Sequence, residues 1–349
     1  MVIPIPSLNT QQIGYKLLSM SNFQGRKGEE VTKTLISASL HKDSVENVSG
    51  AYNVSPQTVR NYVEEQGLQV AEKTLEQVKQ ISLETLKGVK EIELSIDWTT
   101  ITWYGKPVEG LGSSEKGYSW NYATATTKYE GKILILALIP QVNGMTKDEI
   151  VKVLIEQVVA MGFRIKLIAL DAGFYTVEVI KFVSQFNYII GVPVGDVKIY
   201  EEFDGEHVTN SKRRSKDEQV KFRLIVYRRE KIKRKKMKVV YFARATNLDL
   251  PKNKVLELYN KVRNPIETSY RSVKSFLPFT CSTKFIFRML IFLLAVLVYS
   301  LYTILKDNVK MRTFKSLISK IIENISEAEI YLNKSEETLT NTTGLFLRR

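Results

Sequence analysis

The spacing of apolar positions changes twice along the chain. Residues 1–85 repeat apolar side chains with helical spacing, whereas residues 91–194 alternate apolar and polar positions in short runs separated by helical segments. Helical spacing returns after residue 250. These changes predict a helical amino-terminal domain, a mixed α/β sheet and a second group of helices.

The α/β part contains three strands, a helix, a strand, a helix and a strand. We predict the strands over residues 91–97, 118–127, 132–140, 164–171 and 187–194, and the helices over residues 146–161 and 175–186. The first helix opens with Thr146 and Glu149, which form a capping box. This order indicates a mixed sheet whose central strands are strongly apolar.

Two of the predicted strands end on an aspartate. Asp97 follows Ile92, Leu94 and Ile96, and Asp171 follows the apolar run from residue 164. If these strands are parallel neighbours, their carboxylates face each other at the sheet edge where α/β proteins place their sites. An aspartate after a strand also commonly caps the next turn, so each residue alone is compatible with a structural role.

The amino-terminal part contains a candidate helix-turn-helix over residues 42–65. A short apolar stripe ends at a turn around Asn53, and Ser55-Pro56 then forms a helix start. Polar side chains near the start of the second helix suit base edges or phosphates: Gln57, Thr58, Arg60 and Asn61. An ordinary αα-hairpin is the alternative. Residues 70–90 are predicted to form an amphipathic connecting helix.

The charge balance points to a polyanionic partner. Lys and Arg number 51 against 37 Asp and Glu, which leaves a net charge of +14. Residues 210–238 alone carry 14 Lys and Arg against three acidic residues. Two alternating strands are predicted there, over residues 221–228 and 236–246, and we expect DNA-phosphate contacts from Lys221, Arg223 and Arg228. The alternative is a solvated basic hairpin.

Several classes of chemistry are disfavoured by composition. Cys281 is the one cysteine, and His41 and His207 are the only histidines. A disulfide framework, a Cys/His zinc cluster and a Ser/His/Asp triad are therefore not expected. The amino terminus lacks the pattern of a signal peptide, and the 17 apolar residues 289–305 are predicted to form a buried core helix rather than a membrane span.

The stretch from Tyr259 to Lys274 places a carboxylate between two cations. Arg263, Glu267 and Lys274 could share a helix face, since 11 residues make about three turns. Asn264-Pro265 also resembles a helix start with Asn264 as N-cap. In that case Arg263 precedes the helix and Glu267 lies in its first turn.

Asp97, Asp171 and Glu267, on two strands and a helix with a strand-rich block before the helix, resemble the DDE transposases of insertion sequences. Arg263, Glu267 and Lys274 match the last three residues, and so the last two spacings, of that group's YREK signature, Y-x2-R-x3-E-x6-K, whereas Tyr259 lies one position too far from Arg263. Many members have Asp-Arg-Gly-Phe after the second strand; this chain has Asp-Ala-Gly-Phe from Asp171 to Phe174.

The resemblance implies an RNase H-like core over residues 90–194 and 251–310, interrupted by a basic β insertion at 195–250. A helix-turn-helix domain would precede it at 1–85, and a helix and tail would follow at 311–349. Asp97, Asp171 and Glu267 would hold two Mg²⁺ ions, or Mn²⁺, because hard oxygen ligands suit these metals. DNA contacts would include Arg263, Lys274, Tyr259 and Arg271.

The activity implied is metal-dependent cleavage of double-stranded DNA at transposon ends and transfer of the 3′-OH into target DNA. We expect a homodimer or larger assembly on DNA, a cytoplasmic, nucleoid-associated location and no membrane. Two alternatives stay open. One is an inert or domesticated DNA-binding regulator with the same core, and the other is a membrane protein anchored by residues 289–305.

Overall fold

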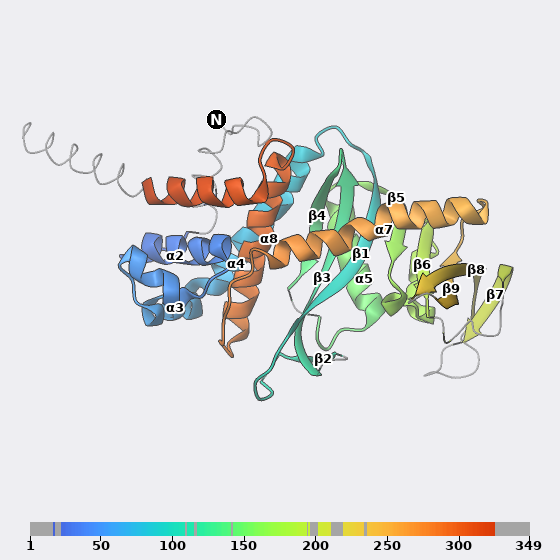
Figure 1. The fold of residues 1–349 in the computed structure, drawn as a ribbon, viewed down its shortest axis with the longest axis horizontal. Coiled ribbons are helices and arrows are strands. Elements are labelled where there is room, and N and C mark those ends of the chain that lie inside the picture. The colour runs from blue at the N-terminus through green and yellow to red at the C-terminus, as the bar shows by residue number, and fades with distance from the viewer. Residues whose placement is uncertain are drawn as a thin grey trace, which may run out of the picture. The chain divides into compact units, whose positions relative to one another are not determined.

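The computed structural model describes residues 22–108, 110–114, 117–140, 142–193, 202–210, 219–233 and 236–324, together with Leu17 and Gly195. The chain divides into two compact units. One comprises residues 86–272, and the other combines the segment before residue 86 with the segment after residue 272. Figure 1 shows the elements of both units in chain order.

The unit formed by the two ends of the chain is helical. Its elements are α2 (Gly28–His41), α3 (Val45–Val48), the 3-10 helix η2 (Ser49–Tyr52), α4 (Pro56–Thr85) and α8 (Phe285–Leu305); residues 311–324 are also helical. The resemblance implies that the apolar helix around residues 289–305 belongs to the RNase H-like core. α8 instead belongs to the helical unit, where it packs against α2 and α4.

α8 is long and apolar enough to cross a membrane, but 83% of its most apolar window is buried in the protein. A core helix has this property as well. The prediction that residues 289–305 form a buried helix agrees with this packing.

The predicted helix-turn-helix forms as two helical segments around a tight turn. Asn53 adopts the left-handed conformation at the end of η2, and the Ser55 hydroxyl accepts a hydrogen bond of 3.0 Å from the Thr58 amide. α4 then runs for 30 residues. The separate connecting helix predicted over residues 70–90 is wrong, because that segment continues α4 as far as Thr85 and β1 begins at Glu91.

The other unit is built on one nine-stranded sheet in the order β2-β3-β1-β5-β6-β9-β8-β7, with β4 also paired to β3. The strands before the insertion are β1 (Glu91–Thr102), β2 (Gly112–Ser114), β3 (Gly117–Tyr129), β4 (Lys132–Ile139), β5 (Arg164–Leu170) and β6 (Tyr188–Val192). Those of the insertion are β7 (Phe203–Asn210), β8 (Gln219–Lys233) and β9 (Lys236–Thr246). The sheet is mixed, as predicted.

β1 and β5 are parallel neighbours, which confirms the arrangement expected for the two aspartate-bearing strands. Their paired region ends at Ile96 and Leu170. Asp171 follows the end of β5, as predicted. Asp97 lies inside β1 rather than at its end, because antiparallel pairing with β3 continues from Asp97 as far as Thr102. Both aspartates nevertheless come directly after the last parallel pair.

The helices of this unit follow the sequence pattern closely. α5 (Lys147–Ala160) starts with the predicted capping box of Thr146 and Glu149 and packs against β3 and β4. Asp171 opens the short 3-10 helix η3 (Ala172–Phe174), and α6 (Val177–Val183) leads to β6.

The insertion extends the core sheet. β9 pairs with β6 on one side and β8 on the other, so the two parts form one continuous sheet. Residues 203–210, which look turn-like in the sequence, form β7 because they pair with β8 along their whole length. Part of the basic segment, residues 211–218 and 234–235, lies outside the described residues.

α7 (Lys252–Lys274) is a single helix with Pro265 inside it. Of the two arrangements that the sequence leaves open, the N-cap at Asn264 does not form, and Arg263, Glu267 and Lys274 lie on one helix. The apolar face of the helix explains the continuity, since Val255, Tyr259, Val262 and Ile266 are all buried. Arg263 therefore lies on the helix, one turn before Glu267. Figure 1 shows α7 crossing in front of the strands.

Candidate active site

Three carboxylates from distant parts of the sequence surround the guanidinium of Arg263. Arg263 Nη2 donates to Asp97 Oδ2 at 2.9 Å and lies 3.7 Å from Asp171 Oδ1, while Nη1 donates to Glu267 Oε1 at 3.2 Å. The predicted acidic residues are thus brought together around one cation. Two of them come from adjacent strands and the third from α7.

The three carboxylates differ in exposure. The side chains of Asp97 and Arg263 are 10% and 6% exposed, whereas those of Asp171 and Glu267 are 47% and 68% exposed. Asp97 also accepts a hydrogen bond of 2.9 Å from the Trp98 amide. The site therefore has one fixed carboxylate at its base and two that face solvent.

Burial and nearby charges perturb the ionisation of this group. Burial raises the pKa of Asp97 to about 6; Arg263 opposes the shift, while Asp171 and Glu267 add to it. Burial acts against the charge of Arg263, but Asp97 and Asp171 outweigh it, so the pKa of Arg263 is raised. Negative charge exceeds positive charge in the cluster, and an additional cation would relieve it.

Two buried tyrosines of α7 connect the helix to the strands beside the carboxylates. Tyr270 donates a hydrogen bond of 2.6 Å to the Asp97 carbonyl, and its hydroxyl also lies 2.8 Å from Thr124 Oγ1. Tyr259 donates to the Leu170 carbonyl at 3.3 Å. The two tyrosines are 11 residues apart, about three helical turns, so they share the face that carries Arg263. Both acidic strands are thereby held against α7.

The donor set fits a divalent metal in charge and chemistry. Carboxylate oxygens suit Mg²⁺ and Mn²⁺. Burial is the main cause of the raised pKa of Asp97, and the charges of Asp171 and Glu267 add to it, so a bound cation would favour the ionised carboxylate. Among the described residues, no group of three or more Asp, Glu, His or Cys is already gathered as a metal site. Arg263 lies between the carboxylates, so metal binding requires its guanidinium to give up contacts there.

The other residues of α7 that are predicted to bind DNA differ in their exposure. Tyr259 is 5% exposed and belongs to an apolar cluster with residues of β5, β6 and β8, so its side chain is not open to DNA. Arg271 is exposed. Lys274 is the last residue of α7 and falls in the helical unit. DNA contacts by Arg271 and Lys274 stay predictions.

The insertion residues predicted to bind DNA already have protein partners. Arg223 forms a two-pronged ion pair with Asp204 and donates to the Leu248 and Leu250 carbonyls. These contacts favour a structural role for Arg223. Lys221 and Arg228 are exposed and make ion pairs with Glu206 and Glu230. Exposed pairs of this kind are weak, so both side chains can exchange partners.

The polar residues of the helix-turn-helix are partly paired with one another. Gln57 donates to Asn61 at 2.8 Å, Thr58 interacts with Ser55, and Arg60 pairs with Glu46. All are exposed or half-buried. Their predicted DNA contacts are not tested by these local interactions.

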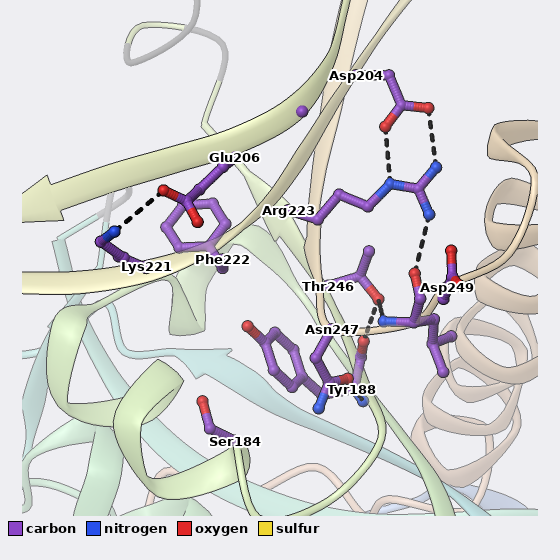
Figure 2. Close-up of a pocket in the computed structure, with 12 residues that line it drawn as sticks. Ser184, Tyr188, Asp204, Glu206, Lys221, Phe222, Arg223, Thr246, Asn247 and Asp249 are labelled. Atoms are coloured by element: carbon purple, nitrogen blue, oxygen red, sulfur yellow. Dashed lines mark hydrogen bonds and ion pairs between the residues drawn. The ribbon is translucent and has the colours of Figure 1, made fainter.

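A pocket of about 620 Å³ lies beside the insertion, and Figure 2 shows its lining. Asp204, Glu206 and Asp249 line it together with Lys221 and Arg223. The three acidic side chains nearly balance the two basic ones. Arg223 and Asp204 form an ion pair in the pocket wall. None of the three active-site carboxylates is among its lining residues.

Tyr270 and Thr124 contact the site but are not predicted from the sequence. The interval of 11 between Tyr259 and Tyr270 is a helical signal, but it requires α7 to be continuous through Pro265. The position of Thr124 opposite Asp97 depends on the pairing of β1 with β3, which local sequence does not indicate.

Comparisons with known proteins bear on this arrangement. The model of a family described as the transposase DDE domain matches residues 89–301, and that of a domain of unknown function (DUF4322) matches residues 4–65. No match was found among curated proteins. A piggyBac transposase, solved by cryo-EM in a synaptic complex with hairpin DNA, is similar in structure, with 13% sequence identity and a TM-score of 0.52. The similarity covers 95% of this chain and 84% of that chain, and at this identity it shows the RNase H-like fold alone.

Proposed function

The chain belongs to the transposase DDE domain family, and we propose that it cuts DNA at the ends of an insertion sequence and joins the freed 3′-OH to target DNA. The observation that carries the proposal is the convergence of Asp97, Asp171 and Glu267 on Arg263. The three carboxylates come from the strand, strand and helix that the resemblance to DDE transposases implies.

Asp97, Asp171 and Glu267 would hold the metal ions. When bound, Mg²⁺ or Mn²⁺ would supply activation of the attacking oxygen and stabilisation of the leaving oxygen in displacement at phosphorus. Asp97 is the fixed member, since its side chain is held by Arg263 and by the Trp98 amide. The side chains of Asp171 and Glu267 are exposed, so they can change position when metal and substrate bind.

Arg263 serves two purposes in this account. Its guanidinium offsets part of the charge of three carboxylates, which keeps them together before substrate arrives. The same planar fork suits a phosphate, so a DNA phosphate competes with the carboxylates for it. Arg271 and Lys274 lie further along α7, and we expect them to contact the phosphates of the DNA backbone.

The proposed partner is double-stranded DNA, bound by an assembly of two or more chains. The net charge of +14 and the basic insertion support DNA binding, and the structurally similar piggyBac transposase forms a synaptic complex with DNA. The helix-turn-helix offers Gln57, Thr58, Arg60 and Asn61 for recognition of the element's ends.

The experiment is cleavage of a duplex that carries the element's end, with and without Mg²⁺, for the wild type and Asp171→Asn. Product strands resolved on a denaturing gel distinguish a simple nick from a hairpin. Metal-dependent cleavage by the wild type and its loss in the variant support the proposal. Equal cleavage by both would remove Asp171 from the site.

The second candidate is a DNA-binding regulator with an inert core. Arg263 already neutralises part of the carboxylate cluster, and the described residues contain no preformed metal site. This candidate predicts specific binding to the end duplex with no metal-dependent cleavage by the wild type, so the same assay separates the two.

A further inference from the structure

Arg244, on the last strand of the insertion, is a charged residue inside an aromatic and apolar layer. Its guanidinium carbon lies 3.9 Å from the ring centre of Tyr259 and 5.4 Å from that of Phe242. Tyr227 stacks on Phe242 with the rings 7° from parallel. Burying a guanidinium among aromatic rings costs free energy unless hydrogen bonds or an opposite charge compensate it.

The hydrogen bonds of Arg244 leave part of this charge unsatisfied. Nη1 donates to the Ala243 carbonyl at 2.7 Å, but Nε is buried and has no hydrogen-bond partner. No carboxylate pairs with Arg244 within salt-bridge distance among the described residues, although Asp171 is close enough to favour its charged form. Burial nevertheless lowers the pKa of Arg244.

The strand register places Arg244 next to the loop that carries Asp171. Arg244 is the cross-strand partner of Gly191 on β6, so the two residues face the same side of the sheet. A Cβ atom on Gly191 would lie 2.8 Å from the Ala172 amide nitrogen. The residue after Asp171 therefore rests directly on the glycine that neighbours Arg244.

Tyr259 provides a second connection between Arg244 and Asp171. The face of its ring holds the Arg244 guanidinium, and its hydroxyl donates to the carbonyl of Leu170, the residue before Asp171. Both neighbours of Asp171 are thus in contact with residues that touch Arg244. This explains how a tyrosine displaced by one position from the YREK spacing can act in the site while remaining buried.

We propose that Arg244 is a second DNA-phosphate-binding cation of the active site, held beside Asp171 by Tyr259; this rests on the proposed function. Arg244 is half-buried and keeps an edge toward solvent. A phosphate that approaches the acidic cluster needs positive charge beside it, and Arg263 must first give up contacts with the carboxylates. Arg244 supplies that charge from a position with no competing ion pair among the described residues.

The test compares full-length wild type, Arg244→Met and Arg244→Gln. Arg164→Gln is the matched control, because Arg164 is an exposed arginine at the opposite end of β5, paired with Glu91. Binding to an end duplex is measured over a range of NaCl concentrations in Ca²⁺, and nicking is measured in Mg²⁺ at saturating DNA. The thermal unfolding midpoint establishes which variants are folded, and Arg244→Gln is used if Arg244→Met is not.

The proposal predicts that loss of Arg244 makes the salt dependence of binding shallower by about 0.9, the value for one phosphate contact. Nicking should fall by about tenfold or more, while Arg164→Gln behaves as the wild type. A folded Arg244 variant with wild-type salt dependence and wild-type nicking overturns the proposal. A wild type that binds the duplex without nicking it contradicts the proposed function instead, and the salt dependence then decides on Arg244 alone.

Discussion

The Arg263 guanidinium lies 2.9 Å from the Asp97 carboxylate, although 166 residues separate the two in the sequence. The pKa of Asp97 stays raised despite this contact. Burial and the carboxylates of Asp171 and Glu267 raise it, and together they outweigh the effect of Arg263. The three carboxylates are therefore held together by one cation that does not fully balance their charge.

The raised pKa of Asp97 predicts a pH dependence of stability in the metal-free protein. The folded state binds a proton below about pH 6, whereas the unfolded state does so near the ordinary value of 3.8. This group therefore lowers stability above pH 6 and progressively less as the pH falls toward 4. We expect Asp97→Asn to be more stable than the wild type at pH 7.5, by about 2 kcal/mol, with a smaller difference at pH 5.

Urea unfolding in EDTA at several pH values from 5 to 8 measures this difference. Glu257→Gln is the control, because Glu257 is an exposed carboxylate on the same helix whose pKa is lowered by Lys254. A difference between Asp97→Asn and wild type that stays constant with pH would show that the ionisation of Asp97 is not perturbed by folding.

The continuity of α7 can be tested at Asn264. In an unbroken helix the exposed Asn264 is an interior residue, so Asn264→Ala should raise stability slightly, by about 0.5 kcal/mol. If Asn264 were an N-cap, the same change would cost about 1 kcal/mol. The two structures predict opposite signs, and denaturant unfolding of the variant decides between them.

The hydroxyl of Tyr270 is expected to stabilise the fold at Asp97. Tyr270→Phe removes a buried hydroxyl that donates to the Asp97 carbonyl and contacts Thr124, so we expect a loss of about 1–2 kcal/mol. Thr124→Val should be coupled to it in a double-mutant cycle, by about 0.5 kcal/mol or more. Tyr104→Phe, at a side chain that is 92% exposed, should have no effect. Additive effects at Tyr270 and Thr124 would argue against the hydrogen bond.

The helix-turn-helix is expected to recognise the element's ends through its exposed polar residues. Gln57→Ala and Asn61→Ala remove a mutual hydrogen bond that is exposed, so the fold should persist. Footprinting should show weaker protection at the end sequence with little change in binding to unrelated DNA. Protection identical to wild type in the double variant would assign these residues to the surface of an ordinary helical hairpin.

The sequence was sufficient to predict that Asp97 and Asp171 each follow an apolar strand segment, because alternation of apolar positions is a local signal. Their adjacency was expected only if the two strands were parallel neighbours, and the structure shows this pairing. The sequence could not decide whether a helix starts at Asn264, because Asn264-Pro265 satisfies the local rule for a helix start while the buried face from Val255 to Ile266 keeps α7 continuous. Tertiary packing outweighed local propensity at this point.

The residues that position the site could not be predicted in the same way. Arg244 depends on the pairing of β9 with β6, and Thr124 on the pairing of β3 with β1. These registers are set by contacts between segments far apart in the chain. Arg223 illustrates the reverse case, since a basic residue expected to bind DNA uses its donors on Asp204 and two backbone carbonyls.

Cleavage by Glu267→Gln is the measurement that shows whether Glu267 is one of the three carboxylates required for metal-dependent cleavage. The Glu267 side chain is 68% exposed, so the change removes one charge with little effect on packing. Glu257→Gln is the matched change three helical turns earlier on α7. With end DNA and Mg²⁺, we expect cleavage by the wild type and Glu257→Gln, none by Glu267→Gln, and DNA binding by all three. Cleavage by Glu267→Gln at the wild-type rate would contradict a catalytic role for Glu267.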